Sequence, residues 1–208
     1  ESLYQASGFV HMEDMNDDWH VNLWGAEKIS RCIAEKLYDA YGITGIQDSQ
    51  WEDTKTYYDM VCRDCELKQI TDIGQYMDAV SREDYTVLIA VKGNGMTFME
   101  ESVKEDFRQM GLFMDYTENS SYFAVIHEGK IEEGTSKEIL VHHGSTGNRL
   151  TDYEIKSAGW DSTYDVCASI KINDKEWARN GNGINVVIYS NERKQVVDSV
   201  SYDGEFKR

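Results

Sequence analysis

The sequence has no proline among its 208 residues, whereas average usage of about 5% would give roughly ten. It also has no apolar run approaching the ~18 residues of a membrane span, and its start shows no signal-peptide pattern. We therefore predict no membrane segment in this chain. The missing proline has no explanation in the residues themselves.

Basic residues are scarce as well. The chain has 21 Lys and Arg against 38 Asp and Glu, which gives a net charge of −17. Residues 1–84 hold 18 acids and 7 bases (−11), and residues 85–208 hold 20 acids and 14 bases (−6). A chain this acidic is repelled by nucleic acid and by anionic membrane surfaces, so we expect neither as a partner.

Cysteine is sparse too, and the four cysteines do not show whether the protein works in an oxidising or a reducing compartment. Cys62 and Cys65 form a C-x-x-C, but it falls in a helical pattern, and no second Cys or His pair follows at zinc spacing. A zinc site and a redox pair are the alternatives to two small residues on a helix, which is the interpretation we favour. We predict no metal and no cofactor.

The composition itself is globular, with 40% hydrophobic and 28% charged residues. Up to residue 84 the pattern is mainly helical. An extended arm at 8–12 precedes expected helices at 26–41, 49–65 and 72–81, and Gly42 is expected to end the first of these helices. The stripe Ile29, Ile33 and Leu37 is expected to face a core in the first helix, as are Ile73, Met77 and Val80 in the third.

From residue 85 onward the pattern changes to strands. The β-branched run at 85–91 predicts a buried strand, and residues 98–110 predict one helix. Further strands, separated by turns rich in Asn and Gly, are expected at 121–127, 138–143, 152–157, 164–172, 184–190 and 196–202, with a turn at Glu128 and Gly129 after the first of them. We therefore predict an α+β chain with domains at 1–84 and 85–208, the second being compact and β-rich with one main helix.

Asp17 and His20 form a D-x-x-H pair. A carboxylate at this spacing can orient an imidazole and stabilise its protonated form. Asp14 and Asp18 compete for the role of Asp17. The acids could instead supply negative charge at the start of the next helix, or bind a cation such as calcium, although the EF-hand spacing is absent.

Residues 17–28 resemble the last conserved block of the SGNH (GDSL-type) hydrolases and acyltransferases, which reads D-x-x-H-x-N-x-x-G before a closing helix. The resemblance covers residues ~9–42 and implies the end of an α/β/α domain, with His20 as general base and Asp17 as its orienting partner. The family's nucleophilic serine and oxyanion-hole blocks lie far upstream of this motif, whereas here 16 residues precede Asp17. Ser2 and Ser7 lack the Gly-Asp context of that serine. We therefore expect an upstream part of the same polypeptide as a partner, and an inactive chain without it.

The second part resembles the interleukin-like EMT inducer domain, over residues ~85–203. The resemblance is carried by residues 85–92, 110–112, 121–126 and 129–130 and, most specifically, by 181–188 together with 196–203. It implies a non-enzymatic recognition module for glycan or protein. Trp160 and Trp177 could stack on a sugar, and Asn180 and Asn182 could hydrogen-bond to it. Either tryptophan could equally be a core or loop-packing residue.

Two functions follow as hypotheses. In the first, the chain is the C-terminal part of a cell-envelope acyltransferase or esterase that acts on surface polysaccharide and carries an appended recognition domain. In the second, it is a secreted glycan- or protein-binding module. Both imply an extracellular or cell-surface location. The adjacent His142 and His143 are not expected to share a metal, because neighbouring strand residues point to opposite faces.

Overall fold

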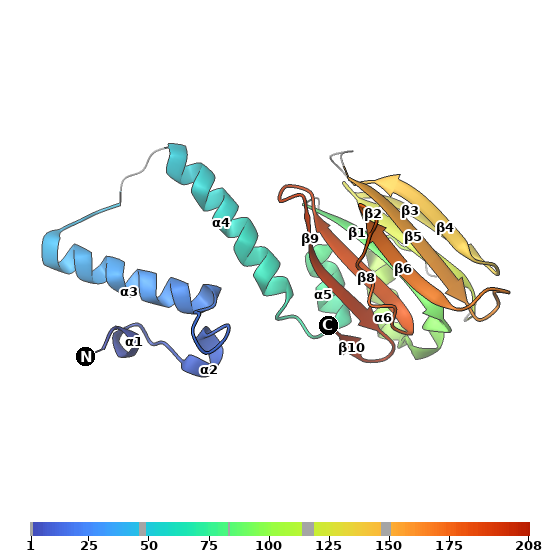
Figure 1. Cartoon of the computed structure of the whole chain (residues 1–208), viewed down its shortest axis with the longest axis horizontal. Coiled ribbons are helices and arrows are strands. Elements are labelled where there is room, and N and C mark those ends of the chain that lie inside the picture. The colour runs from blue at the N-terminus through green and yellow to red at the C-terminus, as the bar shows by residue number, and fades with distance from the viewer. Residues whose placement is uncertain (1, 46–48, 83, 114–118, 147–150) are drawn as a thin grey trace. The chain divides into compact units, whose positions relative to one another are not determined.

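Figure 1 shows the chain as a computed structural model, which describes residues 2–45, 49–82, 84–113, 119–146 and 151–208. Helix and sheet are mixed along the chain, so the predicted α+β class is confirmed at this coarse level. The chain forms two compact units, Glu1–Cys65 and Glu66–Arg208. The division lies nearer to residue 65 than to the predicted boundary at 84, because helix α5 (Ile73–Val80) packs into the core of the second unit.

The first unit is helical. It contains α1 (Leu3–Ala6), α2 (His11–Asp14), α3 (Leu23–Tyr41) and most of α4 (Ser49–Leu67). The side chain of Asn22 accepts a hydrogen bond from the Gly25 N–H at the start of α3. Gly42 ends the helix in the left-handed conformation, at φ 64°, as predicted.

The extended arm predicted at residues 8–12 is wrong. Residues 11–14 form the single turn α2, whose preceding Val10 N–H donates to the Asp14 carboxylate over 2.7 Å. This side-chain bond satisfies the first N–H group of the turn locally. Among the described residues, no strand runs beside this segment to offer it a ladder instead.

The apolar residues of the first unit do not form a buried core. Among its described residues, no aliphatic or aromatic side chain is buried, and Ile33 and Leu37 are 41% and 40% exposed. The predicted helix is therefore present, but the predicted burial of its stripe is wrong in this structure. Helices α1 and α2 contact α3, whose buried residues are Gly25 and Cys32.

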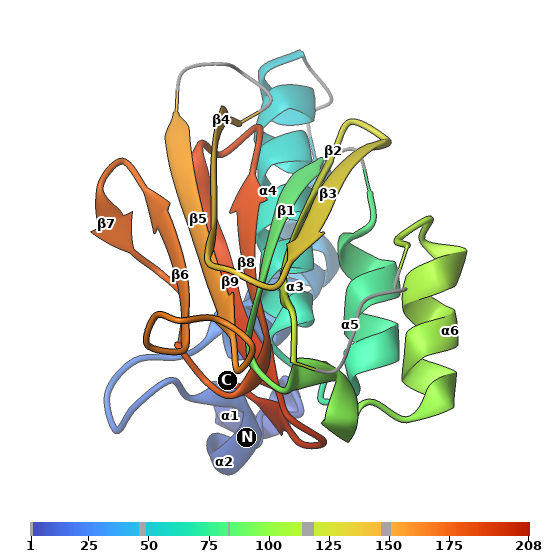
Figure 2. The same cartoon turned by 90° about the vertical axis from the view of Figure 1, so that its right-hand side faces the viewer.

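The second unit is a ten-stranded sheet with helices on one face (Figure 2). Seven of the strands follow one another in the order β10-β9-β8-β1-β5-β6-β7; β2 also pairs with β1, β3 pairs with β2, and β4 pairs with β5. The strand bounds are β1 (Tyr85–Gly93), β2 (Ser121–His127), β3 (Lys130–Ser136), β4 (Leu140–Ser145), β5 (Asp152–Gly159), β6 (Cys167–Ile172), β7 (Lys175–Glu176), β8 (Gly183–Ser190), β9 (Gln195–Tyr202) and β10 (Phe206–Lys207).

Strand β1 organises this unit. It pairs antiparallel with β2 and β8 along most of its length, and parallel with β5 only at Lys92 and Gly93. Side chains on its two faces enter two different cores. Val87 and Ile89 pack with α5 and α6 (Glu101–Gln109), whereas Leu88 and Ala90 pack with β5 and β6, onto which the sheet curls. Burial on both faces explains the uninterrupted apolar run by which this strand was predicted.

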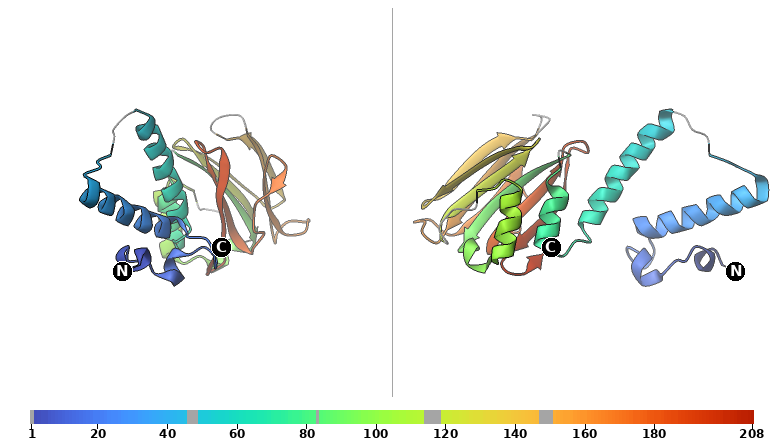
Figure 3. Two further views of the ribbon diagram at one scale, coloured as in Figure 1. Left: turned by 60° about the vertical axis from the view of Figure 1, so that its left-hand side comes forward. Right: turned by 180° about the vertical axis from the view of Figure 1, so that it is seen from behind.

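Two predicted helices cover the sheet of this unit: one was expected at 72–81, before the predicted boundary at 84, and the other is the one main helix expected in 85–208. Figure 3 shows α5 and α6 side by side across the same face of the sheet, and the predicted inward residues Ile73, Met77 and Val80 of α5 are buried. The helix predicted at 98–110 is α6, preceded by the 3-10 helix η1 (Gly95–Phe98). The second unit therefore has two covering helices.

Strand β3 was not predicted. Its sequence, KIEEGTS, has no clear apolar alternation, and it pairs only with β2. The turn predicted at Glu128 and Gly129 is present, with φ 48° and 68°, and it is this hairpin that places β3 beside β2. No helix in the described part of the chain is both long and apolar enough to cross a membrane.

Candidate functional site

The Asp17–His20 pair is formed in the turn before α3. Both carboxylate oxygens of Asp17 lie 2.9 Å from Nδ1 of His20. A carboxylate only accepts hydrogen bonds, so Nδ1 must carry the proton and Nε2 of the neutral ring is left as the acceptor. The side chains are 76% exposed for His20 and 49% exposed for Asp17, so the pair is open to solvent.

Backbone groups of the same turn hold the carboxylate in place. Oδ1 of Asp17 accepts the N–H groups of Trp19 and His20, both over 2.8 Å. The Trp19 N–H, followed by the His20 ring and the His20 N–H, holds the pKa of the Asp17 carboxyl below its usual range. The carboxylate is therefore ionised at neutral pH and oriented before any ligand arrives.

The turn is closed by a short antiparallel contact. Met15 and Val21 form a bridge, the Asn16 N–H donates to the His20 carbonyl over 2.8 Å, and the Asn22 N–H donates to the Asp14 carbonyl over 2.9 Å. Gly25 is required beside this closure, because a Cβ there would lie 2.3 Å from the Asp14 carbonyl oxygen. The glycine of the motif thus allows α3 to approach the turn.

The other two acids take different positions. The Asp14 side chain is 2% exposed and forms a 2.8 Å ion pair with Lys28. Lys28, followed by the Val10 N–H, lowers the pKa of this carboxyl. Asp18 is exposed. Of the three candidates, the structure brings Asp17 to His20, and it uses Asp14 to attach the turn to α3; Lys28 was not identified from the sequence.

The His–Asp pair can act as an oriented base, but a nucleophile is not beside it. Within the described residues, no side chain lies within hydrogen-bonding distance of His20 Nε2. Ser2 caps α1, and the Ser7 hydroxyl donates to the Tyr4 carbonyl. Neither serine contacts His20, in agreement with their lack of a Gly-Asp context.

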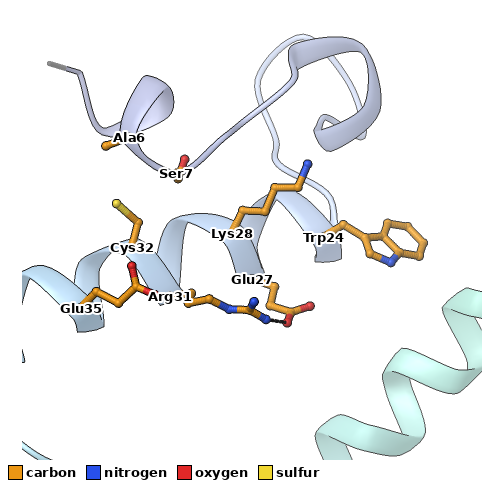
Figure 4. Close-up of a pocket in the computed structure, with 8 residues that line it drawn as sticks. All are labelled: Ala6, Ser7, Trp24, Glu27, Lys28, Arg31, Cys32 and Glu35. Carbon is orange, nitrogen blue, oxygen red and sulfur yellow. Dashed lines mark hydrogen bonds and ion pairs between the residues drawn. The ribbon is translucent and has the colours of Figure 1, made fainter.

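A cavity of about 310 Å³ lies between α1 and α3, and Lys28 is one of the residues that line it (Figure 4). Its wall is about equally polar and apolar and includes the ion pair between Arg31 and Glu27, at 2.6 Å. The lining residues are Ala6, Ser7, Trp24, Glu27, Lys28, Arg31, Cys32 and Glu35. His20 and Asp17 do not line it, so this cavity is separate from the His–Asp pair.

The predicted sugar-binding residues divide into two groups. Trp160 is 58% exposed, and a Cβ on Gly93 would lie 3.2 Å from its Nε1, so the indole lies against the end of β1. Trp177 is half-buried against the core between β1 and β6, with the Lys175 ammonium 3.9 Å from its ring centre. Trp177 therefore packs, whereas Trp160 presents an aromatic surface to solvent.

Asn180 lies on the opposite flank of the same strand end. Its carbonyl accepts from Nζ of Lys92 over 3.0 Å, and its Oδ1 accepts from the Ala168 N–H over 3.2 Å. The Asn182 side chain is exposed in the same loop. Lys92 and Gly93 are consecutive, so Trp160 and Asn180 flank one end of β1; neither Lys92 nor the exposed Tyr164 of the Trp160 loop was identified from the sequence.

The metal alternatives find no support. Within the residues that the structure describes, no group of three or more His, Cys, Asp or Glu side chains could hold a metal ion. Cys62 and Cys65 are free thiols on α4. The His142 ring stacks on Phe123 at 4.3 Å, whereas the His143 side chain is 66% exposed, so the two imidazoles have different surroundings, as expected for neighbours on a strand.

Comparisons with known proteins add nothing to this geometry. No protein-family model, no curated protein and no solved structure matches the chain. The two resemblances described from the sequence therefore stay predictions.

Proposed function

We propose that residues 9–42 supply the His–Asp half of an acyl-transfer site of the SGNH kind, and that residues 85–203 form an appended recognition domain. His20 accepts the proton of a serine hydroxyl at Nε2, the serine oxygen attacks an ester carbonyl, and the proton passes to the leaving alcohol. The serine comes from an upstream part of the same polypeptide. The substrate is an O-acylated cell-surface polysaccharide, which places the protein at the cell envelope.

The observation that carries this proposal is the position of the Asp17 carboxylate. Both its oxygens lie 2.9 Å from Nδ1 of His20, which leaves Nε2 open on an exposed ring. A His that only neutralised a nearby acid would not need the carboxylate held by two further N–H groups, at 2.8 Å each.

The missing core of the first unit supports the same proposal. The stripe of Ile33 and Leu37 on α3 is about two-fifths exposed, although such a face on a helix is normally buried against another layer. A segment that closes a larger α/β/α domain would cover this face with the rest of that domain.

The first experiment uses the chain as it is. We expect no hydrolysis of p-nitrophenyl acetate above the background set by an equal concentration of free imidazole, because the chain lacks the serine nucleophile that His20 would activate. Turnover that disappears in His20→Ala but persists in His143→Ala would show that the chain carries a complete site, and would overturn the proposal of a half-site.

The second experiment uses the complete natural reading frame that contains this chain. We expect it to encode a Gly-Asp-Ser block upstream and to transfer or hydrolyse acetyl esters. His20→Ala should lower that activity by at least about 10³-fold, with the exposed His143→Ala as the matched control. A reading frame without such a serine block, or a His20→Ala enzyme of normal activity, would refute the proposal.

A second candidate function is glycan recognition without catalysis. It is supported by the exposed indole of Trp160 at the end of β1, since an exposed aromatic face is suited to stacking on a sugar ring. Glycan-array binding by the chain should be lost in Trp160→Ala and kept in Trp51→Ala, which removes an indole of similar exposure on α4. Binding to no glycan at all would exclude this candidate.

A further inference from the structure

Asn22 connects the two ends of the turn that carries Asp17 and His20. Its Nδ2 donates to the Glu13 carbonyl over 2.6 Å and lies 3.5 Å from the Met15 carbonyl. Its Oδ1 accepts the Gly25 N–H over 3.0 Å. The amide N–H groups of Asn22 therefore hold the segment that enters the turn, and its amide oxygen holds the first turn of α3.

The entering chain is also fixed from α3. The carboxylate of Asp14 is buried and paired with Lys28, one helical turn beyond Gly25. Residues 13–15 are thus held against the helix by Lys28, and against residues 21–22 by the Met15–Val21 bridge and the Asn22 amide. The Asp17–His20 tip projects from this closed base.

We infer that the Nδ2 amide of Asn22 is a positioning group that sets the geometry of the Asp17–His20 pair, in addition to the helix-capping role of Oδ1. The catalytic meaning of this inference rests on the proposed function, whereas its structural content does not. When the bond to Glu13 is lost, the Lys28–Asp14 pair and the Met15–Val21 bridge still join the two arms, but the base of the turn loosens and Asp17 faces Nδ1 of His20 with both oxygens for a smaller fraction of the time.

The two roles of Asn22 can be separated by substitution. Asn22→Asp keeps an oxygen that caps α3 but has no N–H to donate, and Asn22→Ser likewise keeps a capping oxygen without the amide. Asn16→Asp is the matched control, because it makes the same chemical change on an exposed side chain of the same turn, whose backbone bond to His20 remains.

The readout is the tautomer of neutral His20 in the chain, measured by long-range proton–nitrogen correlation, with helix content followed by circular dichroism. In the wild type and in Asn16→Asp, we expect the proton on Nδ1, as the contact with Asp17 requires. In Asn22→Asp, we expect unchanged helix content and a shift of the proton towards Nε2. Should Asn22→Asp fail to fold, the same measurement on Asn22→Ser decides.

An unchanged tautomer in a folded Asn22→Asp or Asn22→Ser, or an equal shift in Asn16→Asp, would overturn the inference. In the complete reading frame, Asn22→Asp should lower kcat by about tenfold to a hundredfold with little change in KM, because the base is misplaced and the substrate contacts are not. A tautomer shift without any acyl-transfer activity in that reading frame would refute the proposed function and leave the positioning role standing.

Discussion

The buried Asp198 carboxylate gives the sharpest test of what holds the second unit together. Its side chain is 6% exposed, and Oδ2 accepts from Nε and Nη2 of Arg208 over 3.0 and 2.9 Å, and from the Tyr76 hydroxyl over 3.1 Å. Arg208 also donates to the carbonyls of Leu67 and Ile70, over 2.6 and 2.9 Å. One guanidinium thus joins the end of α4, the segment before α5 and strand β9.

The perturbation is a double-mutant cycle at these two residues. Arg208→Met leaves the Asp198 carboxylate buried without its cation, which should lower the free energy of unfolding by about 3–5 kcal/mol. Asp198→Asn removes the charge but keeps an acceptor, and Arg208 is 27% exposed and can turn to water, so we expect a loss of about 1–3 kcal/mol. The double variant should be more stable than the sum of the two losses implies, by about 1–3 kcal/mol.

The assay is urea unfolding at neutral pH, followed by the circular dichroism of the sheet. Lys207→Met is the matched control: it removes the neighbouring cation, which pairs with Asp203 over 2.7 Å near the surface, and should change the unfolding free energy by no more than about 0.5 kcal/mol. Additivity of the Asp198 and Arg208 variants within about 0.5 kcal/mol, or an Arg208→Met loss no larger than that of Lys207→Met, would refute the reasoning.

Three further predictions concern the two units and the sites. A fragment of residues 66–208 should fold by itself, because both buried cores lie within it. Its circular dichroism should match that of the native sheet, and it should unfold cooperatively; a fragment that is unfolded would contradict this. Gly25→Ala should disorder the turn before α3, since its Cβ would lie 2.3 Å from the Asp14 carbonyl, and amide signals of residues 14–22 should shift while those of the sheet do not. Burial, together with nearby Glu132, raises the pKa of Tyr153 to about 12 from an ordinary 10.0, so its contribution to stability is complete below pH 10 and is lost as the pH rises towards 12. Tyr153→Phe should therefore lose less stability than the wild type over that alkaline range, and equal losses in urea titrations would refute this.

The sequence identified the features that depend on a few neighbouring residues. Gly42 ends α3, and Glu128 with Gly129 turns the chain back on itself, because capping and turn conformations are properties of adjacent positions. The D-x-x-H spacing likewise predicted that Asp17 could reach His20, since three residues of a tight turn bring those side chains together. The apolar run of β1 predicted burial on both faces without showing what would cover each face.

Tertiary structure decided everything that joins distant residues. The polar strand β3 exists because β2 offers it a ladder, and Trp160 and Asn180 lie on either side of the same strand end only because β5 and β8 both pair with β1. The contacts of Arg208 with the Asp198 carboxylate and with two backbone carbonyls have no sequence signal, since those carbonyls belong to residues 67 and 70, far from it in the chain. Local conformation follows from local chemistry, whereas the burial of a given side chain depends on which surface meets it, and no spacing along the chain records that.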